Sequence, residues 1–324
     1  MIDTIFRYTE EIDTKIKTTV EQILKSQVVS SSKITQGEVN HVYTVTTENS
    51  VVIARVFRRP HWPEDGKLPW IEEHLTKNGI PHAQTLYYSR DDTYFPYGLM
   101  ISDFVAGKNG IDAICDGDVS FETFHEKLAK LLKQVHSIEI KKFGQINNGA
   151  GQYDNYIDYR VNKLPTRLNQ ITDDSDFDPL MVQKIETVVR KNLESLENKF
   201  KPVLVHGDPT PDNTIYTSDG QIILIDWDGA LSDIWLWDYA WMTYWGSHLS
   251  KFGDIEERRQ KTRESFIHGY GDSMFMLDEI DSIEHTLHIL QAVDLLPYYY
   301  SDHKNREAYD KTKKKLYSLL ALYS

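Results

Sequence analysis

The segment from residue 203 to residue 228 constrains the fold more strongly than any other part of the chain. It contains three short apolar runs that can each form a strand, and an Asp-Gly pair at 219–220, typical of a hairpin turn, joins the last two. His-Gly-Asp-Pro-Thr-Pro-Asp-Asn (206–213) follows the first run, and Asp-Trp-Asp (226–228) follows the third. We therefore expect a small antiparallel hairpin with polar side chains at its ends. The three runs are Val203–Val205, Thr214–Tyr216 and Gln221–Ile225.

The polar residues of this segment have the types and spacing that phosphoryl transfer from ATP requires. Such a reaction needs a carboxylate that orients the attacking hydroxyl and accepts its proton, and oxygen ligands that hold magnesium against the phosphates. Asp208 can provide the carboxylate, and Asn213 and Asp226 can provide the ligands. Asp and Asn also form turns at strand ends without a catalytic role. The ordered spacing and the flanking strands favour the catalytic interpretation.

The order His-x-Asp-x4-Asn, followed by an apolar strand that ends in Asp, is that of the catalytic loop of protein kinases. The stretch 203–245 resembles the aminoglycoside phosphotransferase family, which also includes choline kinases, homoserine kinases and macrolide phosphotransferases. The resemblance extends upstream to the nucleotide loop, the third strand, the hinge exit and one helix of that family. These parts are Gln36–Tyr43, Val52–Phe57, Phe104–Gly107 and Leu131–Ile138.

The resemblance implies a role for each polar residue of the catalytic segment. Asp208 would be the catalytic base, and His206 would brace the catalytic loop. Asn213 and Asp226 would be the magnesium ligands. Asp238 looks like the buried aspartate that holds the backbone amides of this loop.

The resemblance also implies that the first hundred residues bind ATP. Arg55 occupies the position of the strand lysine that normally grips the phosphates, and an arginine can bind phosphate with two hydrogen bonds. Gly37 is the only glycine of the nucleotide loop, and Glu72, in preference to Glu73, is expected to pair with Arg55. The backbone expected to face adenine is that of Asp103, Phe104 and Val105.

The pattern of apolar residues predicts a small sheet followed by a mainly helical part. Before residue 106, helical periodicity covers 4–25 and 70–78, and β-branched or aromatic runs cover 41–47, 51–58, 86–88 and 99–105. Later helices are expected over 121–135, from Asp178–Pro179, and from about 305, with Pro297 breaking another. We predict an α+β, protein-kinase-like bilobal fold, with a small antiparallel-sheet N-lobe and leading helix (1–105) and a large, mainly helical C-lobe (106–324).

Charge and composition limit the partners of the chain. The formal net charge is -13, which opposes binding to nucleic acid or to an anionic membrane but would tolerate a cationic substrate. Cys115 is the only cysteine, so an intrachain disulfide is excluded. Neither a signal-like apolar run near the N-terminus nor an apolar stretch of 18 residues is present, and we expect a cytoplasmic protein.

The sequence leaves the hydroxyl substrate open. An aminoglycoside-type antibiotic kinase and a metabolic kinase for a sugar, a choline-like amino alcohol or homoserine are alternatives, and a nucleotide-binding pseudokinase regulator is a third. Asp228 is either a second metal contact or a helix cap. Asp233, Asp294 and Asp302 are candidate acidic contacts for an amino-containing substrate.

Aromatic residues gather near the C-terminal part of the catalytic region. Four tryptophans at 235, 237, 241 and 245 and three tyrosines at 298–300 could form a cage for a cationic substrate, because ring faces attract ammonium groups. Aromatic residues at this density more often pack between helices, and we favour that interpretation.

Overall fold

The computed structural model describes most of the chain and divides it into two compact units. The described residues are 6, 9–34, 39–91, 93–171, 180–194, 199–244, 252–271, 279–302 and 305–323, without the side chains of residues 301 and 302. Unit one takes in Met1–Gly110, Asn147–Gly149 and Asn213–Gly229, and unit two takes in Ile111–Ile146, Ala150–Asp212 and Ala230–Ser324.

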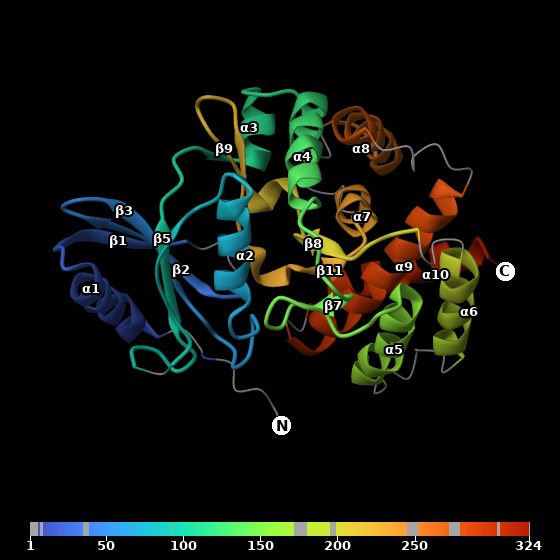
Figure 1. Cartoon of the computed structure of the whole chain (residues 1–324), viewed down its shortest axis with the longest axis horizontal. Helices are drawn as coiled ribbons and strands as arrows, with labels where there is room; N and C mark the ends of the chain where they lie inside the picture. Colours follow the sequence, from blue (N-terminus) through green and yellow to red (C-terminus); the bar gives the residue numbers. More distant parts are fainter. Residues whose placement is uncertain are drawn as a thin grey trace. The chain divides into compact units, whose positions relative to one another are not determined.

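Unit one is built on an antiparallel five-stranded sheet, four strands of which are labelled in Figure 1. The strand order is β1-β2-β3-β5-β4. Its strands are β1 (Val28–Ile34), β2 (His41–Thr47), β3 (Val51–Val56), β4 (Thr85–Ser89) and β5 (Leu99–Asp103). β2 alternates buried and half-buried residues along its whole length, as expected for a strand with one covered face. The β2 and β3 strands pair with His41 opposite Val56.

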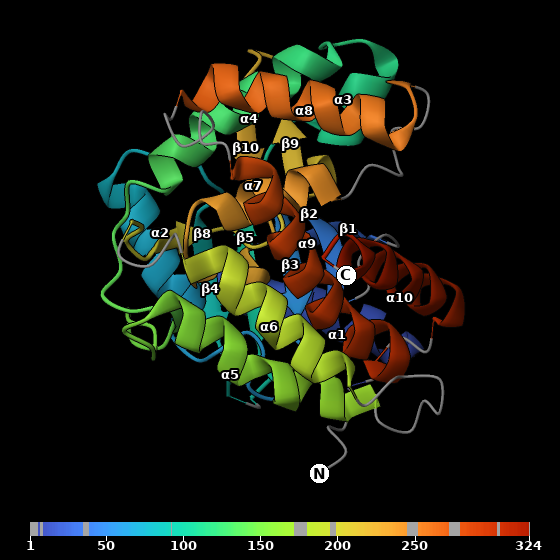
Figure 2. The same ribbon diagram turned by 90° about the vertical axis from the view of Figure 1, so that its right-hand side faces the viewer.

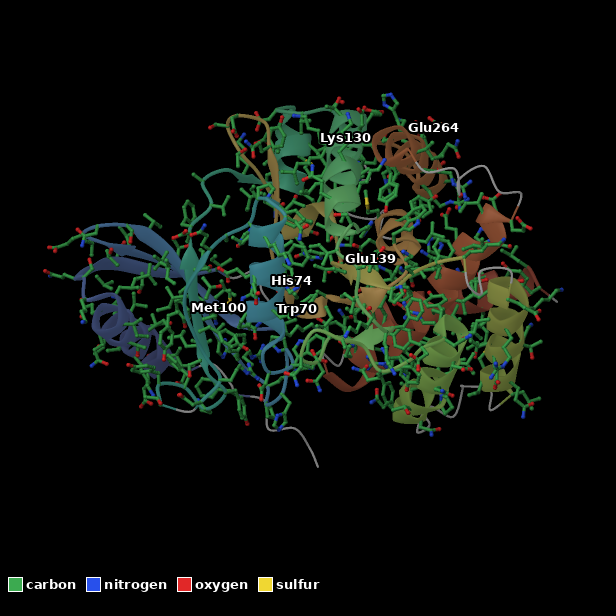
Figure 3. The ribbon with its side chains drawn as sticks, in the orientation of Figure 1. Trp70, His74, Met100, Lys130, Glu139 and Glu264 are labelled. Carbon is green, nitrogen blue, oxygen red and sulfur yellow. The ribbon has the colours of Figure 1, made fainter. Side chains whose placement is uncertain are left out.

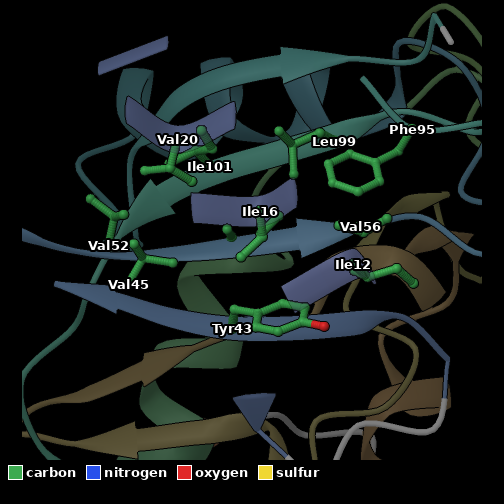
Figure 4. Close-up of a cluster of buried hydrophobic side chains, with 11 residues drawn as sticks. Ile12, Ile16, Val20, Tyr43, Val45, Val52, Val56, Phe95, Leu99 and Ile101 are labelled. Atoms are coloured by element: carbon green, nitrogen blue, oxygen red, sulfur yellow. The ribbon is translucent and has the colours of Figure 1, made fainter. Parts of the chain in front are cut away.

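Helix α1 (Glu10–Leu24) covers one face of this sheet. Its buried residues Ile12, Ile16 and Val20 repeat at a spacing of four and therefore form one apolar stripe. Figure 4 shows this stripe against side chains of β2, β3 and β5, among them Tyr43 and Ile101. Burial of this stripe fixes the helix on the sheet.

Unit one also contains helix α2 (Lys67–Lys77) and a three-stranded sheet. Trp70 and His74 lie one turn apart on α2 (Figure 3), with ring centroids 3.9 Å apart. The small sheet has the order β10-β9-β6, formed by β6 (Lys108–Asn109), β9 (Thr214–Tyr216) and β10 (Ile222–Leu224). β9 and β10 are therefore the hairpin that the Asp-Gly turn predicts.

Unit two is mainly helical. Its described α-helices are α3 (Gly110–Asp116), α4 (Phe121–Val135), α5 (Tyr156–Leu168), α6 (Met181–Leu193), α7 (Leu236–Tyr244), α8 (Ile255–Tyr270), α9 (Ile280–Pro297) and α10 (Arg306–Ala321). The first residue of α3, Gly110, still belongs to unit one. Figure 2 shows α4 and α8 side by side, with α5, α6, α9 and α10 grouped below them. None of the helices formed by the described residues is long and apolar enough to cross a membrane.

A second three-stranded sheet lies in unit two, with the order β7-β11-β8. It is formed by β7 (Gly144–Gln145), β8 (Val203–Val205) and β11 (Leu231–Asp233), and β11 pairs antiparallel with both neighbours. All three residues of β8 are buried, which explains its unbroken apolar sequence. Pairing with β11 thus fixes Val205, the residue directly before His206 and the catalytic loop.

Several sequence expectations differ from the structure in detail. The first helix starts at Glu10 instead of residue 4, and α2 starts at Lys67 instead of residue 70. α9 ends at Pro297, where the break is expected, but a π-helical turn, Tyr298–Asp302, follows it directly. The helix start expected at Asp178–Pro179 lies outside the described residues.

Candidate functional site

The loop after β8 carries His206 and Asp208, and α7 holds it in place. The carboxylate of Asp238 in the first turn of α7 accepts hydrogen bonds from the backbone N–H groups of His206 and Gly207, both at 2.8 Å. The backbone N–H of Asp208 points to His206 Nδ1 at 3.4 Å. His206 is fully buried, whereas Asp208 is half-buried. The loop is thus anchored by its backbone, and the aspartate side chain is left partly exposed.

His136 also contacts Asp238, although no sequence motif assigns it a role. It caps α4, and its Nε2 lies 3.0 Å from Asp238 Oδ2 while its Nδ1 lies 3.0 Å from Tyr270 Oη. A carboxylate only accepts hydrogen bonds, so Nε2 of His136 donates to Asp238. The sequence signal for His136 is a histidine directly after the apolar run of α4.

In unit one, the β9–β10 hairpin brings Asn213 and Asp226 to its open end. The backbone N–H of Ile225 donates to the carbonyl oxygen of Asn213 at 3.0 Å. This bond places Asn213 beside the residue that precedes Asp226. Asp226 has φ 63°, in the left-handed region that only Gly, Asn and Asp visit routinely. Such a conformation costs about 1 kcal/mol or more, and neighbouring contacts must hold it.

Arg55 on β3 contacts both carboxylates of the Asp-Trp-Asp motif. Its Nη1 donates to Asp228 Oδ1 at 2.7 Å and lies 3.1 Å from Asp226 Oδ1. Burial alone would lower the pKa of Arg55, but the charges of Asp228 and Asp226 raise it above the usual value. The arginine therefore keeps its positive charge in unit one.

Asp228 is buried and uses both of its carboxylate oxygens within unit one. Oδ1 accepts from Arg55, and Oδ2 accepts from Asn40 Nδ2 at 2.7 Å. Burial raises the pKa of Asp228, and the charge of Arg55 opposes this shift. Asp228 caps none of the α-helices for which a cap is described, and its carboxylate is used to orient Arg55 and Asn40.

The expected pair of Arg55 and Glu72 does not form among the described residues. Glu72 Oε1 instead accepts from the backbone N–H of Thr85 at 2.7 Å, which ties α2 to the start of β4. The carboxylate of Asp228 is buried and therefore needs a cation, whereas that of the half-buried Glu72 already accepts a hydrogen bond, so the guanidinium pairs with Asp228. The sequence could not show this, because Arg55 and Asp228 are far apart along the chain.

Unit one contains a largely apolar cavity of about 230 Å³. Side chains of β3, β5, α2 and β10 line it, including Ile53, Met100, Ile71 and Leu224; Met100 on β5 is labelled in Figure 3. Its other lining residues include Arg55, Glu72, Asp226 and the segment Asp103–Val105. The cavity thus joins an apolar surface to charged groups.

The segment that leaves β5 presents unused backbone groups at this cavity. The N–H of Asp103 already donates to the carbonyl oxygen of Gln84 at 2.9 Å. Neither Phe104 nor Val105 has a backbone hydrogen bond to another residue that the structure describes. Of the three residues expected to face adenine, the last two therefore have both backbone groups available. Gly37, the glycine of the nucleotide loop, lies outside the described residues.

The candidate acidic substrate contacts lie in different environments. Asp233 is 0% exposed on β11 and pairs with the buried Arg160, so its carboxylate does not fit the expectation of a substrate contact. Burial raises the pKa of Asp233, and the charge of Arg160 opposes the shift. Asp294 on α9 is partly exposed and pairs with Arg167 at 3.1 Å. The side chain of Asp302 lies outside the described part of the chain.

The described tryptophans of unit two are packing residues. Trp235, Trp237 and Trp241 are 8%, 2% and 9% exposed. Trp235 stacks on Tyr270 with ring centroids 4.5 Å apart, and the guanidinium carbon of Arg160 lies 3.5 Å from the ring centroid of Trp237. Trp245 lies outside the described residues. The arrangement fits the interpretation as a core better than that as a cage.

The residues of the hairpin end fit a magnesium ion. The side chain of Asp226 is 40% exposed, yet its Oδ1 is buried and accepts no well-aligned hydrogen bond from a described residue. Across the described residues, no group of three or more His, Cys, Asp or Glu side chains is placed to hold a metal ion. Magnesium commonly takes only one or two protein oxygens and completes its shell with water and phosphates, and Asp226 with Asn213 provides that donor set.

The fold is that of known small-molecule kinases. An apo structure of a thermostable mutant of aminoglycoside phosphotransferase APH(4)-Ia has a TM-score of 0.71 at 14% identity, covering 95% of this chain and 99% of that chain. Choline kinase LicA from Streptococcus pneumoniae has a TM-score of 0.66 at 17% identity, covering 95% and 100%. The predicted protein-kinase-like α+β fold is confirmed.

A family model identifies the chain more closely than its fold does. The model of the phosphotransferase enzyme family, abbreviated APH, matches residues 31–280. The chain belongs to this family, and the resemblance seen in the sequence is confirmed. Among curated protein sequences, none matches the chain.

Proposed function

We propose that this protein is an ATP- and magnesium-dependent phosphotransferase that transfers the γ-phosphate to a hydroxyl group of a small molecule. The cavity of unit one carries the proposal. It combines an apolar lining with the free backbone groups of Phe104 and Val105, and Arg55 and Asp226 also line it. This combination suits a purine ring followed by phosphates.

In the proposed reaction, the substrate hydroxyl gives its proton to Asp208 while its oxygen bonds to the γ-phosphorus. The bond between this phosphorus and the bridging oxygen breaks, and ADP leaves with the electron pair. Asp238, through the backbone of His206 and Gly207, holds the loop that carries the base. When bound by Asn213 and Asp226, magnesium would neutralise the charge of the phosphates. Arg55 would contact the phosphates.

The substrate class that we propose is an aminoglycoside-type compound, with a metabolic amino alcohol, sugar or homoserine as the alternative. One solved relative in fold is a ternary complex of a thermostable mutant of APH(4)-Ia with ADP and hygromycin B, with a TM-score of 0.68 at 13% identity, covering 94% of this chain and 97% of that chain. Choline kinase LicA supports the alternative to a similar degree. The presence of Asp208, Asn213 and Asp226 favours an enzyme over a pseudokinase, because a regulator needs no base.

We further propose that the nucleotide-binding lobe ends near Val105 along the chain and that the substrate site lies within 106–324. Residues 106–110, 147–149 and 213–229 of that range differ from the expected division, because they belong to unit one. The end of β5 (Leu99–Asp103), just before this position, supports the boundary. A cytoplasmic location and the absence of nucleic acid partners remain proposals that rest on the net charge of -13 and the single cysteine.

The test is an ADP-release assay on a panel of aminoglycosides, hygromycin B, choline, homoserine and sugars. For the compound that is turned over, Asp208→Asn should lower kcat by about 100-fold or more, because the proton acceptor is lost. Asp212→Asn is the matched control, since Asp212 is an exposed aspartate of the same loop. It should stay within about twofold of wild type. Equal kcat values for wild type and Asp208→Asn would contradict the mechanism.

A further inference from the structure

Lys67, at the first position of α2, is a lysine with a fully buried side chain, 0% exposed. Its Nζ donates to Glu64 Oε2 at 2.8 Å and to the backbone carbonyl oxygen of Asp228 at 2.9 Å. The ammonium also lies 4.9 Å from the ring centroid of Trp62. All of these residues belong to unit one.

Burying an ammonium group is costly, and an apolar side chain would fill the same space at a lower cost. Burial lowers the pKa of Lys67, and Glu64 opposes that shift. The stem of the lysine adds only apolar contacts that Met or Leu could also make. What the ammonium adds is its hydrogen bonds to Glu64 and to the main chain of Asp228, which an apolar residue cannot make.

That bond fixes the turn that follows the candidate metal ligand. Trp227–Gly229 forms a single 3-10 turn, and Asp226 precedes it with its left-handed φ of 63°. Asn40 and Arg55 hold the side chain of Asp228, and Lys67 holds its carbonyl oxygen. Three segments of unit one therefore hold Asp228, two positions after Asp226. These contacts limit how far the strained backbone of Asp226 can relax.

We propose that Lys67 is a positioning residue that keeps Asp226 in the orientation required to bind magnesium. The proposal rests on the proposed function of the chain as a magnesium-dependent phosphotransferase. Lys67 has no exposed surface, so it acts through the backbone of Asp228 and touches neither nucleotide nor metal. It lies outside the motif segments and 161 positions from Asp228, which is why sequence alone does not reveal it.

The first experiment measures ADP binding by calorimetry, with magnesium and with EDTA. For wild type, magnesium should tighten ADP binding. In Lys67→Met, which keeps the apolar stem, this gain should fall by about 10- to 100-fold, the usual effect of losing a group that orients a metal ligand. Affinity in EDTA should stay the same. Lys77→Met, at an exposed position of the same helix, should keep the full gain. An unchanged gain in Lys67→Met would overturn the proposal.

The second experiment needs no ligand, so it separates this inference from the proposed function. Amide hydrogen exchange over residues 226–230 should be faster in Lys67→Met than in wild type, with β5 and α1 unaffected. Glu64→Gln, which keeps the lysine but removes one of its anchors, should give a smaller change and serves if Lys67→Met fails to fold. Exchange equal to wild type in the folded variants would refute the positioning role. Absence of ADP binding by wild type, with faster exchange in the variant, would instead refute the proposed function.

Discussion

Asp233 and Asp294 show how much the surroundings of a carboxylate decide its role. Both are aspartates that pair with an arginine, and the sequence gives no reason to separate them. Asp233 and Arg160 are buried, 0% and 2% exposed at their side chains, whereas Asp294 and Arg167 are 24% and 38% exposed. A buried charge left without its partner is far more costly than an exposed one.

Substitution by asparagine should separate the two aspartates. Asp233→Asn leaves the guanidinium of Arg160 buried without a counter-charge, and we expect a loss of about 3–5 kcal/mol in the free energy of unfolding. Asp294→Asn should cost at most about 1 kcal/mol, because solvent screens that pair. Urea denaturation of the two variants and wild type at neutral pH measures both. A loss for Asp233→Asn no larger than that for Asp294→Asn would show that the buried pair is not structural.

At the scale of elements, α4 and α8 approach so closely that one position allows no side chain. A Cβ atom on Gly269 of α8 would lie 2.3 Å from the carbonyl oxygen of Glu126 and 2.9 Å from Cβ of Ala129, both on α4. The backbone atom cannot move without moving the helix. Gly271, two residues later, has only Lys133 Nζ nearby, at 4.0 Å.

Gly269→Ala should therefore destabilise unit two by forcing the two helices apart. We expect a loss of about 1–3 kcal/mol in the free energy of unfolding, even though alanine is the better helix former. Gly271→Ala, with φ +66° but open space, should cost about 1 kcal/mol from backbone strain alone. Thermal denaturation followed by circular dichroism compares them. Gly269→Ala as stable as wild type would mean that the helices can separate without cost.

The elements that sequence predicts well are those with a strong local pattern. β2 (His41–Thr47) and β8 (Val203–Val205) have the predicted bounds, because β-branched runs there end at turn residues or at the catalytic loop. β1 (Val28–Ile34) is missed, since its three serines hide an edge strand in which each residue is half-buried or exposed. β11 is missed because its Leu-Ser-Asp sequence becomes a strand only through its pairing with β7 and β8.

The candidate site follows the same division. Asp208, Asn213 and Asp226 stand in one ordered motif and can be proposed from sequence alone. Partners that hold the site come from distant segments: Asp238 fixes the loop that carries Asp208, and His136, 102 positions away, contacts Asp238. Such pairings arise from tertiary packing, for which a single sequence carries no periodic signal.

At the scale of the whole molecule, buried neutral histidines couple stability to pH. Burial lowers the pKa of His125 on α4 from 6.5 to about 4, and that of His288 on α9 from 6.5 to about 3. In the unfolded chain both rings take up a proton near pH 6.5, while the folded protein keeps them neutral. Between these pKa values the unfolded state binds more protons, so stability must fall as the pH is lowered.

Replacing one of these histidines should remove its share of the acid sensitivity. His125 packs on Phe121 with ring centroids 4.1 Å apart, and His125→Phe keeps an aromatic ring there. Keeping His125 neutral in the folded protein lowers the free energy of unfolding on acidification, and the loss between pH 6.5 and pH 4 is about 3 kcal/mol. Urea titrations at pH 7 and pH 4 give the drop in the free energy of unfolding for each protein. This drop should be about 3 kcal/mol smaller in His125→Phe than in wild type. His268→Phe, at an exposed position, should follow wild type within about 1 kcal/mol. Parallel losses in wild type and His125→Phe would show that His125 is protonated in the folded protein as readily as in the unfolded chain.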